Sequence, residues 1–537
     1  MLDYHDEVWE KKAITLLEKM QRDDGSWYIL DKTELHFTIS NEEIEQMLEI
    51  KASTIRNTIS ALLALELYNA NKTNIEKAKK YLHNMDKTLV DPFTAVFLAY
   101  FNRWSWQEIK IPPIEVLLLP SNCKFGINRF IPVWIRDAAI GVLVFKTLCE
   151  KKIIRSPLKR LAIRKALKLI KGNQLKNGSW FGTFQPTVYP ILAIKMIEKT
   201  NNNIYIQKAF SFLFSKTDTQ TGYMHRFNLP VWDTSFALSA LIECEYPKTE
   251  NVIQSACNYL INAQLDNGNN NWGFAPEVTL YPDCDDTAVA TYALLKTGYH
   301  KSYFEKTIAW LLDMQNNDGG WPAFIKNQAI KKRGTLPTSV EDSLTILRDP
   351  SIADITGHVI KTLSAYGYDI KNVHIQRGIN FLFNDQLDNG SWYGRWGLCY
   401  IYGTTRVLNA FFSIGYDMND KRIQKAINWL ISHQNKDGGW GEHFIAYFRE
   451  DKGGIGYSTP CHTGWVLNTL IPIIGVNSEI ILKGVNYLLS TQKTNGTWES
   501  NVTVGALEIY ENTMYSVTFP LLGLATFNKY KYDKKKN

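Results

Sequence analysis

The chain has 537 residues, enough for two domains with large cores, and 45% of them are hydrophobic and 13% aromatic, which excludes an intrinsically disordered protein. The 60 basic and 53 acidic residues give a mild formal charge of +7, spread along the chain apart from a short run at 534–536. Without a nucleic-acid motif, this balance favours an anionic small substrate or an anionic lipid surface over nucleic acid.

Cysteine usage and hydropathy indicate a cytoplasmic protein. The seven cysteines are odd in number and form no CxxC pair, which favours a reduced compartment. The polar, acidic start of the chain, residues 1–7, argues against a secretory signal. The longest apolar run, 138–148, contains Lys146 and falls short of the roughly 20 residues of a membrane span. We expect a buried helix there, with peripheral membrane contact left open.

One pattern recurs along the chain: Gln, three residues, Gly, one residue and Trp (QxxxGxW). The copies lie at Gln21–Trp27, Gln174–Trp180, Gln264–Trp272 (degenerate), Gln315–Trp321, Gln386–Trp392, Gln434–Trp440 and Gln492–Trp498. Each copy follows a helix-compatible segment, such as 309–314. Gly allows a tight turn, the Gln amide can bond backbone groups at a neighbouring helix end, and Trp can stack over it. Helix hairpins repeated in this way form a solenoid or a closed α/α barrel, so we predict an all-α fold in which the repeats are structural.

The spacing of the repeats divides the chain. Copies are sparse before Gln174 and dense from Gln264 onward. We therefore predict two helical domains, 1–230 and 231–537, with the boundary near Pro230.

The segment Tyr281–Ala288 carries three carboxylates within four positions, Asp283, Asp285 and Asp286, directly ahead of the apolar run 289–295. Such clusters are usually helix caps and first-turn carboxylates that complement the helix dipole. Crowded carboxylates in a dry site instead raise at least one pKa, which leaves a protonated, aimed acid at neutral pH. Both interpretations are open from these residues alone.

The repeats together with the Asp-x-Asp-Asp-Thr-Ala segment (DxDD) resemble the class II terpene cyclases of the squalene–hopene cyclase superfamily. The resemblance covers nearly the whole chain and includes the segments Pro230–Thr234, Asn389–Gly397, Tyr400–Thr404 and Ser458–Pro460. It implies two α/α barrels, γ-like for 1–230 and β-like for 231–537. It also implies an isomerase that protonates an alkene or epoxide, after which a carbocation closes rings until a base removes a proton.

The resemblance assigns catalytic roles. Asp285 is implied to be the proton donor, flanked by Asp283 and Asp286. His358, in the segment that begins at Asp354, is implied to heighten the acidity of the donor by a hydrogen bond. Asp354 and His358 are four residues apart, so on a helix they share one face and can touch.

Carbocations need an environment that stabilises charge without capturing it, and aromatic faces do this through their quadrupole. The resemblance places five aromatic residues at cavity positions. These are Trp232, Phe274, Phe324, Trp396 and Tyr402, the last of them also near the acid.

Departures from the family bear on the substrate. The chain is shorter than squalene cyclases, and it has Val504, Glu508 and Asn512 where those enzymes have aromatics that serve the last rings. Val188 likewise replaces an expected Trp. Fewer rings at the far end of the cavity disfavour the long squalene cascade.

Three arginines are candidates for binding a diphosphate: Arg56, Arg129 and Arg226. Guanidinium groups suit phosphate through bidentate, charge-assisted hydrogen bonds. An Asp-Asp-x-x-Asp motif is absent from the sequence, so we expect no class I ionisation and a diphosphate that survives in the product.

The leading hypothesis is therefore a cyclase that converts a linear prenyl diphosphate, geranylgeranyl diphosphate, into a bicyclic diphosphate. Mg²⁺ is the expected cofactor with such a substrate, although its ligands are not identified, and no organic cofactor is expected. A class I synthase or a phosphatase would then act downstream.

Two alternatives stay open. The first is a squalene-type triterpene cyclase on one membrane leaflet. The second is a barrel similar to protein prenyltransferase β subunits, which bind Zn²⁺ through Asp-x-Cys and a distant His. Asp283 and Cys284 lack the intervening residue of that pattern.

Overall fold

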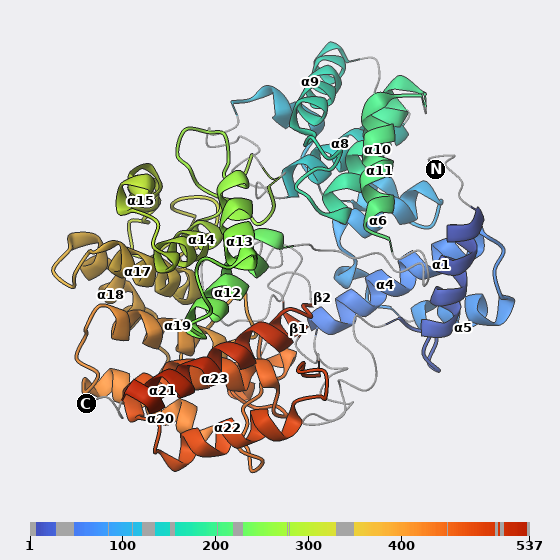
Figure 1. Ribbon diagram of the computed structural model, residues 1–537. Helices are drawn as coiled ribbons and strands as arrows, with labels where there is room; N and C mark the ends of the chain where they lie inside the picture. Colours follow the sequence, from blue (N-terminus) through green and yellow to red (C-terminus); the bar gives the residue numbers. More distant parts are fainter. Residues whose placement is uncertain are drawn as a thin grey trace. The chain divides into compact units, whose positions relative to one another are not determined.

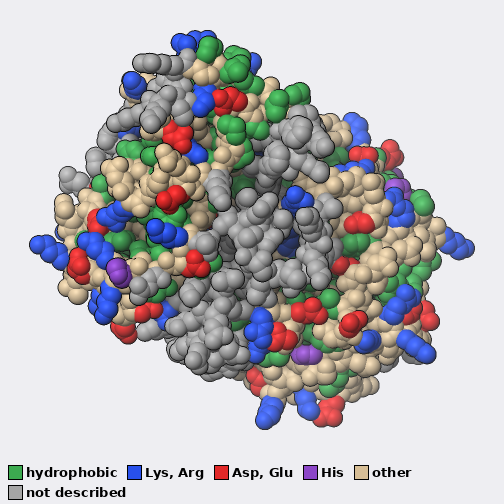
Figure 2. Space-filling view, turned by 180° about the vertical axis from the view of Figure 1, so that it is seen from behind, with side chains coloured by type: hydrophobic (Ala, Val, Ile, Leu, Met, Phe, Trp, Pro, Cys, Tyr) green, Lys and Arg blue, Asp and Glu red, His purple; other side chains and the backbone are tan. Residues whose placement is uncertain are grey.

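A computed structural model describes residues 7–27, 48–83, 85–109, 111–120, 135–150, 156–200, 202–217, 229–276, 278, 280–328, 348–447, 449–499, 503–504 and 510–533. These residues are almost entirely helical, and they divide into two compact units, the second of which begins at Leu229 (Figure 1). On the face drawn in Figure 2, Lys and Arg side chains are interspersed with Asp and Glu. The domain limits expected from the repeats, 1–230 and 231–537, stay a prediction.

The first unit packs helices around tryptophan-centred clusters. Its α-helices are α1 (Glu7–Met20), α4 (Leu48–Leu67), α5 (Lys72–His83), α6 (Pro92–Tyr100), α8 (Arg136–Cys149), α9 (Pro157–Asn173), α10 (Phe184–Glu198) and α11 (Ile204–Ser215), with 3₁₀ turns η1 (Lys87–Leu89), η2 (Trp106–Glu108) and η3 (Ile114–Leu118). The apolar run 138–148 lies in α8, whose residues 137–145 are buried, as expected of a core helix. Within the described parts of the chain, no helix is long and apolar enough to cross a membrane.

The second unit is built on a closed ring of six helices. The ring helices are α12 (Pro230–Glu243), α14 (Cys284–Thr297), α17 (Ala353–Tyr366), α19 (Tyr400–Ser413), α21 (Pro460–Ile474) and α23 (Tyr515–Asp533). Each contacts the next along the chain, and α23 returns to contact α12, which closes the ring (Figure 1). All six carry apolar, mostly buried sequences, because they are covered on more than one side.

Further helices form an additional layer. They are α13 (Asn251–Asn262), α15 (Glu305–Asp313), α18 (Val373–Asp385), α20 (Lys421–Ser432) and α22 (Glu479–Thr491), with the turns η5 (Lys301–Phe304), η6 (Phe444–Tyr447) and η7 (Glu450–Lys452). Of these helices, α13, α15, α18 and α20 each pack against one ring helix, and α22 packs against both α21 and α23. A two-stranded antiparallel pair, β1 (Thr503–Val504) and β2 (Tyr510–Glu511), precedes α23, with Thr503 opposite Glu511. The second unit is thus a helix ring with an additional layer of helices.

The repeat segments tie these layers together. Gln315 donates from Nε2 to the carbonyl of Gly319 and to that of His374 in the first turn of α18, both at 2.8 Å. Gly319 has a φ of 97°, and a Cβ there would lie 2.3 Å from the carbonyl oxygen of Arg377, so only glycine fits. Trp321 is fully buried beside this turn. Equivalent pairs of Gln hydrogen bonds occur at Gln21, Gln174, Gln386 and Gln434.

Candidate active site

The three carboxylates of the DxDD segment lie at the N-terminus of α14. Asp283 is the N-cap, and its Oδ1 accepts hydrogen bonds from the main-chain nitrogens of Asp285, at 2.7 Å, and Asp286, at 3.3 Å. The cap preference of Asp at this position explains why the helix begins here. The ordinary interpretation therefore holds for Asp283, whereas the side chains of Asp285 and Asp286 are left for other contacts.

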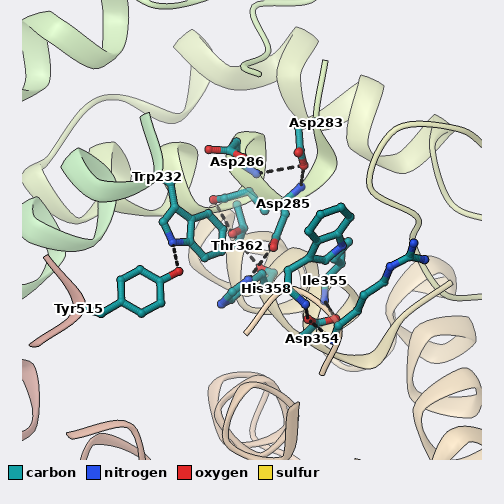
Figure 3. Close-up of polar contacts among 12 residues, drawn as sticks. Trp232, Asp283, Asp285, Asp286, Asp354, Ile355, His358, Thr362 and Tyr515 are labelled. Atoms are coloured by element: carbon teal, nitrogen blue, oxygen red, sulfur yellow. Dashed lines mark hydrogen bonds and ion pairs between the residues drawn. The ribbon is translucent and has the colours of Figure 1, made fainter. Parts of the chain in front are cut away.

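Asp285 forms a buried pair with His358 of α17 (Figure 3). Its Oδ1 lies 2.6 Å from His358 Nδ1, and the two residues are only 3% and 5% exposed. Burial raises the pKa of Asp285 to about 8, although the charge of Arg406 lowers it, and burial lowers the pKa of His358 well below its ordinary value. At neutral pH the carboxyl group of Asp285 therefore keeps its proton, and the imidazole of His358, its hydrogen-bond partner, is neutral.

Further carboxyl groups crowd the same end of the ring. Burial, followed by repulsion from neighbouring carboxylates, raises the pKa of Asp283 and of Asp286 well above the usual range. Asp286 Oδ1 is buried and has no hydrogen-bond partner among the described residues. Asp233 of α12 accepts a 2.9 Å hydrogen bond from Asn512, and burial raises its pKa to about 6. Several carboxyl groups buried close together favour the protonated, neutral form of these groups.

Asp354 holds the loop that precedes α19. Its Oδ2 accepts from the main-chain nitrogens of Arg395 and Trp396, both at 2.9 Å, and its Oδ1 accepts from Ile355 N at 3.0 Å (Figure 3). Burial, followed by repulsion from Asp285, raises the pKa of Asp354 to about 6. The residue that we expected to touch His358 thus directs its hydrogen bonds to the main chain, which orients Trp396.

Two of the five predicted aromatic residues surround His358. The ring centroids of Trp232 and Tyr402 lie 5.8 and 6.2 Å from its imidazole, and that of Phe236 lies at 5.8 Å. Trp232 Nε1 donates to Tyr515 Oη at 2.5 Å, so the ring of Trp232 has a fixed orientation (Figure 3).

The other predicted residues are not among the aromatic neighbours of His358. Phe324 and Trp396 contact each other edge to face at 6.1 Å, and Phe274 is buried in the segment between α13 and α14. Arg56 is a half-buried residue of α4 in the first unit, whereas Arg129 and Arg226 lie outside the described residues.

Sequence reasoning missed the buried residues that support this site. The ring of Trp465 of α21 packs against that of Tyr402, tilted by 59° at a centroid distance of 4.9 Å, and the ring of Phe519 of α23 lies 5.3 Å from that of Trp465. Arg406 stands one helical turn after Tyr402, with its guanidinium 5.1 Å from the Tyr402 ring. A charged residue on an otherwise apolar helix was the one available signal for Arg406.

A second missed residue, Glu442, anchors the start of α19. Its buried carboxylate accepts hydrogen bonds from the main-chain nitrogens of Cys399, Tyr400 and Ile401 and of Gly454, at 2.9–3.1 Å. Three of these donors are amides that the N-terminus of α19 leaves free, and the fourth is Gly454, which follows η7. Glu442 therefore fixes the helix that carries Tyr402 and Arg406.

The acidic side chains near α14 are not arranged as a metal site. Within the described part of the chain, no group of three or more His, Cys, Asp or Glu side chains is arranged to hold one. Asp283 and Asp285 of the DxDD segment are instead engaged as a helix cap and as the partner of His358, so these two carboxyls do not form a ready Mg²⁺ site. Mg²⁺ stays a prediction tied to the substrate.

Asp285→Asn is expected to stabilise the protein increasingly as the pH rises. The pKa of Asp285 is about 8 in the folded chain against 3.8 in a model carboxyl, so the folded state holds an extra proton between these values. The stability that this carboxyl provides is complete below pH 4 and is lost as the pH rises towards 8. Asparagine needs no proton, so the melting temperature of the variant should gain about 3 °C per pH unit over wild type between pH 5 and 8.

Melting curves at several pH values test this prediction, with Asp388→Asn as the matched control. Asp388 is exposed in the turn after α18, so the same replacement there controls for the loss of a carboxyl that is not buried. If the difference in melting temperature between Asp285→Asn and wild type did not change with pH, Asp285 would not have the raised pKa.

The geometry of this site agrees with the comparison of the chain with known families. Residues 228–529 match the squalene-hopene cyclase C-terminal domain, and residues 46–153 match the squalene-hopene cyclase N-terminal domain. The chain belongs to the squalene–hopene cyclase family. This confirms the resemblance found in the sequence, and it makes the protein a class II terpene cyclase that takes an isoprenoid substrate. The alternative of a prenyltransferase-like barrel is thereby set aside.

Individual members of the squalene–hopene cyclase family match most of the chain. A squalene–hopene cyclase of Alicyclobacillus acidocaldarius is 30% identical to this chain. The match spans 88% of this chain and 85% of the length of that enzyme. A sporulenol synthase of Bacillus subtilis is 32% identical and covers 89% of this chain and 90% of its own. Among solved structures, an ent-copalyl diphosphate synthase of Streptomyces platensis is similar in fold, with a TM-score of 0.53 at 13% identity, over 96% of this chain and 92% of its own.

Proposed function

We propose that this class II terpene cyclase starts its reaction by proton transfer from Asp285 to the terminal double bond of a linear isoprenoid. The buried 2.6 Å pair of Asp285 and His358 carries this proposal, because it holds a proton at neutral pH in a place that water does not reach freely. The O–H bond of Asp285 breaks, the π electrons of the alkene form the new C–H bond, and the adjacent carbon becomes the cation. Later double bonds then attack in turn, until a base removes a proton.

The surroundings of Asp285 suit this step. The imidazole of His358 is hydrogen-bonded to the acid and so fixes the position of its carboxyl group. Asp283 caps α14 and holds the amide of Asp285 in position. The rings of Trp232 and Tyr402, close to His358, offer π faces to the first cation at about 0.5–2 kcal/mol each. Phe274, Phe324 and Trp396 are proposed to serve cations formed later.

We further propose that the closed helix ring of the second unit is one α/α barrel and that the first unit is a second, with the QxxxGxW segments as the ties between layers. The ring contacts and the double hydrogen bonds of the Gln side chains support this arrangement.

For the substrate we propose a prenyl diphosphate, geranylgeranyl diphosphate, and a bicyclic diphosphate as the product. Asn512, which stands where squalene cyclases have an aromatic residue, supports this choice. Its amide binds Asp233 beside the acid cluster, so this position offers a polar pair rather than a π face. Arg56, Arg129 and Arg226 would bind the diphosphate, and Mg²⁺ would reduce the charge of that group. A phosphatase or a class I synthase would then consume the product.

A squalene-type triterpene cyclase is the second candidate. It is favoured by the relatives themselves, since proteins named squalene–hopene cyclase and sporulenol synthase match most of the chain at 30% and 32% identity.

A direct assay separates the two candidates. Wild type and Asp285→Asn are incubated with farnesyl diphosphate, geranylgeranyl diphosphate and squalene in Mg²⁺ buffer, treated with phosphatase and analysed by gas chromatography. We expect a bicyclic alcohol from geranylgeranyl diphosphate with wild type only. Cyclic product from squalene alone would overturn the diphosphate proposal and support the second candidate.

A further inference from the structure

Arg406 is a buried cation in the interior of the helix ring. It lies on α19, is 4% exposed, and its guanidinium stands 5.1, 5.8 and 5.9 Å from the ring centroids of Tyr402, Trp465 and Phe519. Its Nε and Nη2 atoms have no hydrogen-bond partner among the described residues. This guanidinium is shielded from bulk solvent and forms no ion pair with a carboxylate among the described residues.

The packing of α19 against α17 places Arg406 beside the acid pair. A Cβ at Gly357, the residue before His358, would lie 2.8 Å from the main-chain oxygen of Arg406, so the two helices touch at this point. One turn earlier on α19, the ring of Tyr402 is 6.2 Å from that of His358. The positive charge therefore acts on both members of the pair, and it lowers the pKa of Asp285 and of His358.

A buried and unpaired cation is costly, and its three aromatic contacts offset only part of the cost. Such a group is explained if a negative charge arises next to it during the reaction. In the proposed function, on which this inference rests, that charge is the carboxylate that Asp285 becomes when its proton leaves.

We propose that Arg406 is a positioning residue of the cyclisation reaction that stabilises the Asp285 carboxylate during proton transfer. As the O–H bond of Asp285 breaks, the electron pair stays on the carboxylate oxygen and the proton forms a C–H bond with the alkene. The negative charge on Asp285 is met by the fixed charge of Arg406, while the positive charge moves away along the substrate. Because a guanidinium stays charged, it supplies this field without exchanging a proton.

The other titratable groups do not supply such a field. The groups coupled to Asp285, His358 or Arg406 are Asp283, Cys284 and Asp286 on α14, Asp354 and Lys361 on α17, Tyr402 on α19, Cys461 on α21 and Tyr515 on α23. Asp233 on α12 acts on Asp286. All but Lys361 are neutral or negative. Burial, with a smaller effect of Arg406, lowers the pKa of Lys361 to about 7, so its charge is partly lost at neutral pH.

The test compares Arg406→Lys with two neutral variants, Arg406→Met and Arg406→Gln. The second neutral variant serves if the first does not fold. The pKa of Asp285 is measured without substrate, from the pH dependence of the melting temperature of each protein with and without Asp285→Asn. The pH profile of kcat is measured on the substrate that wild type accepts. Lys361→Met is measured in parallel, so that the titration of the Lys361 amine can be distinguished from that of Asp285.

In the neutral variants the pKa of Asp285 and the alkaline limit of kcat should both rise by about 1–3 units, the size of an Arg–Asp interaction, and kcat should fall at least about tenfold. Arg406→Lys should keep both values near those of wild type. An unchanged pKa in the neutral variants, or a pKa shift with unchanged kcat, would overturn the proposal. Failure of wild type to cyclise any isoprenoid would instead refute the proposed function, while the pKa measurement would still report on Arg406.

Discussion

Asp285→Asn is expected to lower kcat for cyclisation by about 10⁴-fold, the upper range of general-acid catalysis. The amide has no acidic proton, and two of the neighbouring carboxyls are engaged by the main chain. Asp283 Oδ1 is engaged by two main-chain amides, and the hydrogen bonds of Asp354 go to the loop before α19. The measurement is product formed per enzyme by gas chromatography, at matched protein concentration.

Two further measurements serve as controls for this prediction. The melting temperature of Asp285→Asn should not fall, which separates a chemical defect from a folding defect. Asp388→Asn, an exposed replacement of the same kind, should retain wild-type kcat. If Asp285→Asn kept more than about one hundredth of wild-type activity, below the usual range of such an effect, another group would have to be the acid.

Glu442→Ala is expected to destabilise the second unit by about 3–5 kcal/mol, the cost typical of removing one partner of a buried charged network. The carboxylate accepts four main-chain hydrogen bonds, and alanine would leave those amides buried without partners. The start of α19 should loosen, so Tyr402 and Arg406 would lose their positions and activity should fall as well. Urea unfolding followed by circular dichroism measures the loss.

Glu450→Ala is the matched control for this change. Glu450 is exposed in η7, near Glu442 in the chain, and its replacement should alter stability by less than about 0.5 kcal/mol. Since the chain has two units, the transition of the second unit is compared rather than a single global value. Equal unfolding midpoints for the two variants would mean that the amides at the start of α19 find other partners.

Much of the fold was accessible from the sequence. The repeated Gln, Gly and Trp residues predict helix hairpins because a glycine turn and a helix-end hydrogen bond are local events, and the described chain is helical as predicted. Family membership was accessible for the same reason, since ordered short segments survive at 30–32% identity. The substrate could not be predicted from the sequence, because it depends on cavity shape and on residues from many helices.

The residues that support the site were not identified from the sequence. Glu442 binds amides of residues about 40 positions earlier in the chain, and Arg406 acts through rings on α21 and α23. No local pattern marks Glu442, and the one signal for Arg406 is a charged residue on an otherwise apolar helix. Asp354 illustrates the same limit, because its spacing from His358 allows a contact on one helix face, while its hydrogen bonds reach Arg395 and Trp396.

The sequence by itself determined the helical class, the repeat architecture and the presence of a carboxylate cluster at a helix start, all of which depend on neighbours within a few residues. Tertiary structure decided which carboxylate becomes the acid. Asp285 meets His358, 73 positions away, in a buried ring of six helices, and burial raises its pKa to about 8. The physical reason is that removing a carboxyl from water, not its place in a motif, sets the free energy of its charged form.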